Sequence, residues 1–371
     1  MKNKSVPFYV MCPLLRHVPF YVNEPYRASR LAACLVTETE RMNALNNSVI
    51  QQKLARTICK FPTEWEAATI DARFSCWADI KSKSFTLPSK HWHFHPREFI
   101  RWFRRCGWLS EKEMYQLFPS TALRPDGKNR WVSEAVLLST STLSSARIPL
   151  NQTCRKYGIV TPLRMAAFYA NAMQETMWFG VLHEKNSSAR YYPWDGRGFL
   201  QLTWPANYIK YWRFTGKVIS ATLETTLTTA QKAADQQGSN APLDTAEAQV
   251  PQAMRDWRDT DLIRVPDSAD AAGAYWAWTQ AAQHADEAPV NIRKTQSAGK
   301  MHVYYSSEGM GKVAATVNFG HSSENYAHVN GIVARFQAYT ACQMILLDNP
   351  SFPDAKGSSQ PIPENYTQRR P

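Results

Sequence analysis

The clearest structural signal in the chain is a helix that ends at a glutamate. Pro162 suits the first position of a helix, because proline lacks the N–H group that the first turn leaves unpaired. Small and apolar residues then recur at helical spacing: Leu163, Ala166, Ala167, Ala170 and Met173. The pattern predicts a buried helix over residues 162–176, with Glu175 at its end.

Other apolar stretches indicate the fold class and the domains. Helices are predicted over 272–283 and 329–347, and any sheet should be short, so the fold class is mainly α. At roughly 100–200 residues per domain, 371 residues suggest two domains. Residues 120–150 are rich in Ser, Thr, Arg and Pro and predict a connection, which places the boundary near 145–150. We expect an N-terminal segment (1–150), a main domain (151–348) with a surface insertion at about 219–262, and a disordered tail (349–371).

Composition narrows the class of protein. The hydrophobic fraction of 44% and charged fraction of 20% exclude global disorder. The net charge is +12, most of it within residues 1–150, and favours nucleic acid, an anionic membrane or an anionic polymer such as a bacterial wall, without choosing among them.

Export signals and disulfides are not expected. The apolar N-terminus is broken by Pro7, Pro13 and Pro19, so we expect no signal peptide, and no run of about 18 apolar residues predicts a membrane span. The seven cysteines are widely spaced and include no CxxC pair, which favours a reduced chain over a disulfide framework or a zinc site.

Two carboxylates close to the helix end could do chemistry. Glu175 and Glu184 lie nine residues apart in an aromatic-rich stretch. Glycoside hydrolysis needs one carboxyl kept protonated as the acid and one ionised to activate water. The alternative is that both are ordinary surface glutamates.

The segments after this pair resemble a known family. Residues 192–208 contain Gly196-Arg-Gly-Phe-Leu-Gln-Leu-Thr-Trp-Pro-Ala-Asn-Tyr208, and the chain is similar there to the lysozyme-like superfamily, most closely to the chitinase and endolysin domains of glycoside hydrolase family 19. The resemblance covers roughly residues 155–345, about half of the chain. Its matching stretches are 164–176, Glu184, 192–208, 272–278 and 317–335.

This resemblance implies a two-lobed helical domain with a central cleft and roles for individual residues. Glu175 matches the general acid, Glu184 the base, and Thr203 the hydroxyl that positions the attacking water. Family members invert the anomeric carbon, which implies carboxyls about 6.5–9.5 Å apart. Positions expected to contact sugar or brace the cleft are Tyr192, Gln201, Asn207, Tyr208, Asn318 and Arg335.

The chain departs from the family at three points. The usual His-Glu is Gln174-Glu175, the Asn-Gly-Gly of the closing block is Asn318-Phe319-Gly320, and the insertion at 219–262 could reshape one wall of the cleft.

The resulting functional hypothesis is a muramidase that cuts the β-1,4 bond between N-acetylmuramic acid and N-acetylglucosamine in peptidoglycan. Residues 93–110 are similar to a segment that precedes the lysozyme-like domain of type VI secretion effectors. The N-terminal segment is then a delivery or docking segment. An antibacterial effector would be made in the bacterial cytoplasm, act in the periplasm of a target cell, and meet a secretion component and an immunity protein. A chitinase and an inactive wall-binding module remain alternatives, and no cofactor, nucleic acid or membrane insertion is expected.

Two other motifs have a functional interpretation and a purely structural one. His91, His93 and His95 would share one face of a strand and could bind a metal, but the chain lacks the upstream His-x-x-x-Asp that zinc peptidases of this pattern need, so a structural turn is preferred. The basic run Arg97–Arg105, with Trp102 and Phe103 interleaved, could hold an acidic polymer, yet a solvated helix face explains it as well.

Overall fold

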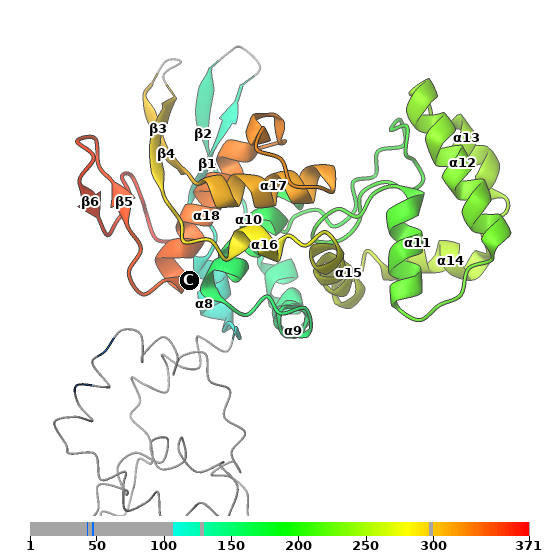
Figure 1. Ribbon diagram of the computed structural model, residues 1–371, viewed down its shortest axis with the longest axis horizontal. Coiled ribbons are helices and arrows are strands. Elements are labelled where there is room, and N and C mark those ends of the chain that lie inside the picture. Colours follow the sequence, from blue (N-terminus) through cyan, green and yellow to red (C-terminus); the bar gives the residue numbers. More distant parts are fainter. Residues whose placement is uncertain (1–42, 44–46, 48–106, 127–129, 297–299, 371) are drawn as a thin grey trace, which may run out of the picture. The chain divides into compact units, whose positions relative to one another are not determined.

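The computed structural model describes residues 107–126, 130–296 and 300–370, together with residues 43 and 47. The chain divides into two compact units, Met1–Trp92 and His93–Pro371, and the continuous described segments belong to the second. Those segments are mainly helical, and their strands form short two-stranded pairs (Figure 1). The mainly α fold class predicted from the sequence is therefore confirmed.

Two helices form the centre of this unit. Helices α10 (Pro162–Glu175) and α18 (Ile332–Leu346) pack against each other more extensively than any other pair of described elements. Helix α10 begins as predicted, because the Thr161 hydroxyl accepts a hydrogen bond from the Arg164 backbone N–H and Pro162 occupies the first turn. Every residue from Met165 to Gln174 is buried. Glu175 is therefore the first residue after this stretch whose side chain reaches the surface.

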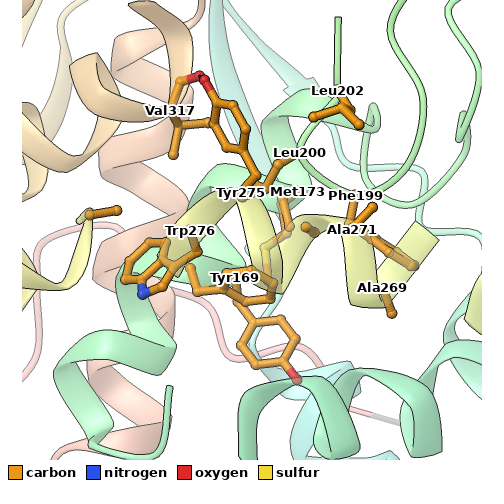
Figure 2. Close-up of a cluster of buried hydrophobic side chains, with 14 of the residues drawn as sticks. Tyr169, Met173, Phe199, Leu200, Leu202, Ala269, Ala271, Tyr275, Trp276 and Val317 are labelled. Carbon is orange, nitrogen blue, oxygen red and sulfur yellow. The ribbon is translucent and has the colours of Figure 1, made fainter. Parts of the chain in front are cut away.

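Three further helices enclose α10. Helix α9 (Thr140–Lys156) packs on α15 (Val265–Trp278), and α17 (Glu308–Phe319) packs on both α10 and α18. Figure 2 shows side chains of α10, α15 and α17 meeting in one cluster with Phe199 and Leu200 of the loop before α11. Trp276 lies in this core, with its ring 5.7 Å from that of Phe168. Short α16 (Ala282–Ala285) follows α15.

The segment predicted as a surface insertion, residues 219–262, folds into helices that pack beside the helix before it. Helices α11 (Pro205–Phe214), α12 (Ala221–Gln237), α13 (Ala241–Glu247) and α14 (Gln252–Asp256) lie together on the right of Figure 1, and a π-helical turn, η4 (Trp257–Asp261), leads back to α15. One face of α12 is buried through Leu223, Leu227, Ala230 and Ala234. The Trp257 ring packs 4.9 Å from Trp212 of α11, which joins the insertion to the helix before it.

Three antiparallel hairpins complete the described unit. Strand β1 (Thr121–Pro125) pairs with β2 (Trp131–Ala135), β3 (Ile292–Gln296) with β4 (His302–Ser306), and β5 (Phe352–Pro353) with β6 (Ser359–Gln360). Their registers pair Thr121 with Ala135, Ile292 with Ser306, and Phe352 with Gln360. Short α8 (Glu111–Gln116) precedes β1, and the 3-10 turn η5 (Tyr326–His328) precedes α18.

The structure does not divide at the domain boundary predicted from the sequence. Residue 150 falls inside α9, and the Asn151 side chain of that helix exchanges hydrogen bonds of 2.9 and 2.8 Å with the Leu109 backbone. Residues 107–150 therefore cover the same core as the rest of the unit. The Ser- and Thr-rich composition of residues 120–150 predicted a connection, but these residues form a hairpin and the start of a helix.

The tail predicted as disordered is packed against the unit. Phe352 is fully buried, with its ring 5.1 Å from that of Tyr305. Near the end of the chain, the Arg369 guanidinium donates to the carbonyls of Pro119 and Val136. Proline, serine and glycine in this stretch predicted the absence of local structure, but contacts with residues more than 200 positions away order it.

Across the residues described, none of the helices is long and apolar enough to cross a membrane. Cys154 and Cys342 are both buried, and their sulfurs are not in disulfides.

Candidate active site

Glu175 is held at the end of α10 by a buried arginine. The Arg335 Nη2 atom donates to Glu175 Oε1 at 2.5 Å, and Arg335 Nη1 donates to Asn171 Oδ1 at 2.6 Å. Asn171 and Glu175 are four residues apart on one helix, so they share a face and can engage one guanidinium. Arg335 is only 1% exposed and Glu175 is 16% exposed. The carboxyl group therefore lies at the edge of the core with one oxygen fixed.

The start of α18 supplies that arginine. Arg335 Nε also donates to the Asn330 carbonyl at 3.0 Å, and the Asn330 N–H lies 3.4 Å from Asn318 Oδ1. Asn318 thus contacts the loop before α18, whose Asn330 carbonyl accepts from Arg335. Asn318 and Arg335, both predicted site residues, therefore lie in connected contacts beside Glu175.

Helix α15 places Tyr275 within electrostatic reach of Glu175. Tyr275 donates from its hydroxyl to the Val317 carbonyl at 3.2 Å. Burial raises the pKa of Tyr275 to about 12, and the negative charge of Glu175 contributes to the rise. Figure 2 shows Tyr275 of α15 beside Val317 of α17. Trp278, one turn further, lies partly exposed under the Lys210 ammonium group, 5.0 Å away.

Glu184 occupies a different environment, on an exposed loop with three donors. Tyr191 donates from its hydroxyl to Glu184 Oε1 at 2.8 Å, and Asn186 Nδ2 lies 3.3 Å from the same oxygen. The Gly196 N–H donates to Glu184 Oε2 at 3.1 Å. Both carboxylate oxygens of Glu184 are therefore held by hydrogen bonds.

A side chain at position 196 would crowd Gln201 and Glu184. A Cβ atom there would lie 2.4 Å from Gln201 Oε1 and 3.2 Å from Glu184 Oε2. The glycine lets the backbone approach the carboxylate closely enough to donate to it. The Glu184 N–H in turn donates to the Gly196 carbonyl, and isolated bridges join Arg197 to His183 and to Leu202. These contacts hold residues 183–184 against residues 196–197 and 202, and we call this small extended unit the platform of Glu184.

Other predicted site residues follow Glu184 in the sequence, and several of their polar groups already make hydrogen bonds to the backbone of this region. Thr203 donates from its hydroxyl to the Gln201 carbonyl at 2.7 Å, so only its oxygen lone pairs remain to accept from a water. The Gln201 amide donates to the Gly198 carbonyl and the Asn207 amide to the Thr203 carbonyl, both at 2.9 Å. Tyr192 is half-buried, directly after Tyr191.

Tyr208 lies in the core instead of at a sugar-facing surface. Its side chain is fully buried, and its hydroxyl donates to the Asp195 carbonyl at 2.5 Å and accepts from Arg197 Nη1 at 2.9 Å. The structure therefore gives Tyr208 a supporting position beneath the platform. The motif that includes Tyr208 contains both buried supporting residues and residues near the surface, and their spacing in the sequence does not distinguish the two.

A buried charge network below the platform was missed by the sequence analysis. Asp195 is fully buried, and its two oxygens lie 3.0 Å from Arg197 Nη1 and from His183 Nε2. Arg197 reaches Asp259 of η4 at 2.8 Å, and Asp259 pairs with Arg258. No local pattern indicates the link to Asp259, which lies 62 positions from Arg197, whereas Asp195 and Arg197 are only two positions apart.

The network shifts the titration of two of its members. Burial lowers the pKa of His183 and the positive charge of Arg197 lowers it further, while Asp195 opposes the shift. The pKa of Asp259 is also lowered, because hydrogen bonds and charge from Arg258 outweigh burial, which acts in the opposite direction.

Unusual backbone conformations gather in the same region. In the described segments eight residues other than glycine have positive φ, and six of them lie between positions 177 and 204: Met177, Trp178, Phe179, Lys185, Gln201 and Trp204. Such conformations cost of order 1–3 kcal/mol each and concentrate at functional sites. In the sequence these residues begin shortly after Glu175 and lie on both sides of Glu184. Their backbone conformations are an observation separate from the sequence motifs.

Packing joins the turn after Glu175 to the platform of Glu184. Phe179 of that turn is fully buried, and its ring lies 4.8 Å from the ring of Phe199. The Thr176 hydroxyl accepts from the Phe179 N–H at 3.0 Å, which fixes the turn. The two carboxylates are therefore supported by elements that pack on each other.

Two cavities of the described chain lie elsewhere. One of about 660 Å³ is lined by Val136 and residues 366–370 of the tail, and one of about 340 Å³ lies between β1, β4, α18 and the tail. Neither includes a residue predicted for the site. Both follow from the way that the tail crosses the hairpins.

Metal ligands are not grouped in the part of the chain that the structure describes. There, no three or more His, Cys, Asp or Glu side chains are placed to hold a metal ion. His91, His93 and His95, and the basic run Arg97–Arg105, lie outside the described residues.

Comparisons with known proteins give no relative. No protein-family model, no curated protein and no solved structure matches the chain.

Proposed function

We propose that the chain is a peptidoglycan glycoside hydrolase that cleaves the β-1,4 bond between N-acetylmuramic acid and N-acetylglucosamine. The observation that carries the proposal is the contrast between the two carboxylates. Glu175 lies at the edge of the core with one oxygen taken by Arg335, whereas Glu184 is exposed and receives hydrogen bonds on both oxygens. Two carboxyl groups in unlike environments, one for the acid role and one for the base role, are what glycosidic hydrolysis uses.

In the proposed reaction Glu184 removes a proton from a water molecule, whose oxygen attacks the anomeric carbon. Glu175, protonated at Oε2, gives its proton to the glycosidic oxygen as the C–O bond breaks. The products are a free hydroxyl on one sugar and an inverted reducing end on the other, and both carboxyls exchange protons with solvent before the next cycle. The Thr203 hydroxyl oxygen, near the platform, is the group proposed to orient the water.

The substrate class rests on sequence features. Peptidoglycan is an anionic polymer, and the net charge of +12 favours attraction to it. The similarity of residues 93–110 to a segment of type VI secretion effectors supports an antibacterial effector that acts on the wall of another cell. A secretion component and an immunity protein are the partners that this role implies.

The stereochemistry of the product tests the mechanism. Purified full-length protein is incubated with a peptidoglycan oligosaccharide, and the first-formed anomer is followed by proton NMR. The proposal predicts an α-configured reducing end on N-acetylmuramic acid. A β anomer would contradict inversion, release from chitin oligosaccharides alone would make the protein a chitinase, and binding without release would leave a wall-binding module.

A further inference from the structure

The hydroxyl that approaches Glu184 most closely comes from a residue outside the predicted site. Glu184 is exposed, and a free glutamate at such a position samples many rotamers. Among its three donors, the Gly196 N–H is fixed by the backbone and the Asn186 amide is the most distant, at 3.3 Å. The Tyr191 hydroxyl, at 2.8 Å, makes the shortest contact.

Tyr191 is itself held firmly. Its ring packs edge-on against Trp204, with ring centroids 5.4 Å apart, and its carbonyl accepts from the Trp194 N–H at 2.8 Å. Trp204 has a positive φ of 73° and precedes the first turn of α11, so its ring direction is set by an unusual backbone. The tyrosine therefore presents its hydroxyl from a fixed point of the platform.

A further contact of Trp204 extends this support to helix α12. The Arg190 guanidinium lies 5.7 Å from the Trp204 ring and pairs with Asp235 of α12 at 3.2 Å. Glu184 is thereby connected, through two aromatic rings and one ion pair, to a helix more than 40 positions away in the sequence.

The chemistry of the contact suits a carboxylate that must accept a proton. Glu184 Oε1 accepts from the Tyr191 hydroxyl and the Asn186 amide, whereas Oε2 accepts only from the Gly196 N–H, so Oε2 keeps a lone pair for a water. Burial and the neighbouring charge of Glu184 raise the pKa of Tyr191 above its usual value near 10, which keeps its proton in place over any ordinary assay pH.

We propose that Tyr191 is a positioning residue for Glu184, one that orients the carboxylate for removal of a proton from water without contacting the sugar. This inference rests on the proposed function. Its separate content is that the reaction rate, and not the affinity for glycan, depends on the Tyr191 hydroxyl.

The test compares Tyr191→Phe with the wild type in steady-state cleavage of soluble peptidoglycan fragments. Loss of a hydrogen bond to a charged group predicts a kcat that falls roughly ten- to a hundredfold, with KM changed less than about twofold. Because a carboxylate with fewer donors is protonated more easily, the acid limb of the kcat profile should move to higher pH. Asn186→Ala removes the longer contact and should lower kcat less than Tyr191→Phe does. Tyr115→Phe, on α8 beneath Arg369, serves as the matched control.

The outcomes separate the two proposals. If Glu184→Gln is inactive but Tyr191→Phe keeps the wild-type kcat and pH profile, or loses only affinity, the positioning role is wrong and the hydrolase stands. If Glu184→Gln retains full activity, the base assignment fails and the role of Tyr191 fails with it. Thermal unfolding of each variant shows whether a lost rate reflects a lost fold.

Discussion

The buried arginine below the platform permits the sharpest prediction about stability. Arg197 is 2% exposed and donates to three groups of the 193–208 loop region: the carbonyls of Pro193 and Asp195 and the Tyr208 hydroxyl. It also donates to Asp259 of η4. The carboxylate oxygens of Asp195 make no well-aligned hydrogen bond, so the 3.0 Å contact with Arg197 acts through charge.

Substitution Arg197→Leu would leave the fully buried Asp195 without its main positive partner. Breaking a buried ion pair from one side costs about 3–5 kcal/mol of unfolding free energy, because the remaining charge stays buried and uncompensated. For a domain of this size each kcal/mol lowers Tm by about 2–4 °C. We therefore expect a fall of roughly 6–20 °C, measured by calorimetry or circular dichroism at neutral pH.

An exposed pair of the same chemistry is the control. Arg213 donates twice to Glu224, and both side chains are at least one-third exposed. Arg213→Leu should cost less than about 1 kcal/mol, since solvent screens exposed pairs. Adding Asp195→Asn to Arg197→Leu should recover part of the loss, with a coupling of about 0.5–3 kcal/mol. Equal small losses for Arg197→Leu and Arg213→Leu would refute the reasoning.

Three more predictions concern single positions. Gly196→Ala places a methyl group 2.4 Å from Gln201 Oε1, so cleavage should fall more than about tenfold, and unchanged kinetics would count against the platform. The pKa of His183 in the folded chain lies below its usual 6.5, so as pH falls the unfolded chain takes up this proton before the folded chain does. The free energy of unfolding that is present above pH 6.5 should therefore decrease until pH has passed the lowered pKa. Tm measured against pH should show this step, and His183→Asn should remove it. Phe352→Ala empties a fully buried site in the tail and should cost about 3–5 kcal/mol in denaturant unfolding, whereas a loss below 1 kcal/mol would mean that the tail does not stabilise the unit.

Helix α10 shows why part of this fold could be predicted from the sequence. Thr161, Pro162 and the apolar spacing that follows are local signals, and the helix begins and ends within a residue of the prediction. The position of Glu175 at its end follows directly. At Gly198, whose φ is 80°, the residue type likewise indicates a special backbone.

Other parts depend on contacts that no local pattern contains. Arg335 meets Asn171 across 164 positions, and Asp259 meets Arg197 across 62. Tyr191 lies only seven positions from Glu184, but no sequence pattern indicates that its hydroxyl donates to Glu184 Oε1. The tail and the boundary inside α9 are further cases in which composition predicted local disorder or a connection, and distant packing partners produced order instead.

The most direct test of the account is digestion of purified peptidoglycan by the wild type, Glu175→Gln and Glu184→Gln, with the products identified by mass spectrometry. Glu308→Gln, at the exposed start of α17, is the matched control. We predict disaccharide-peptides with N-acetylmuramic acid at the reducing end from the wild type and the control, and a loss of at least about a hundredfold in both site variants. Digestion at the wild-type rate by either site variant, or no release of fragments by the folded wild type, would contradict the two-carboxylate account.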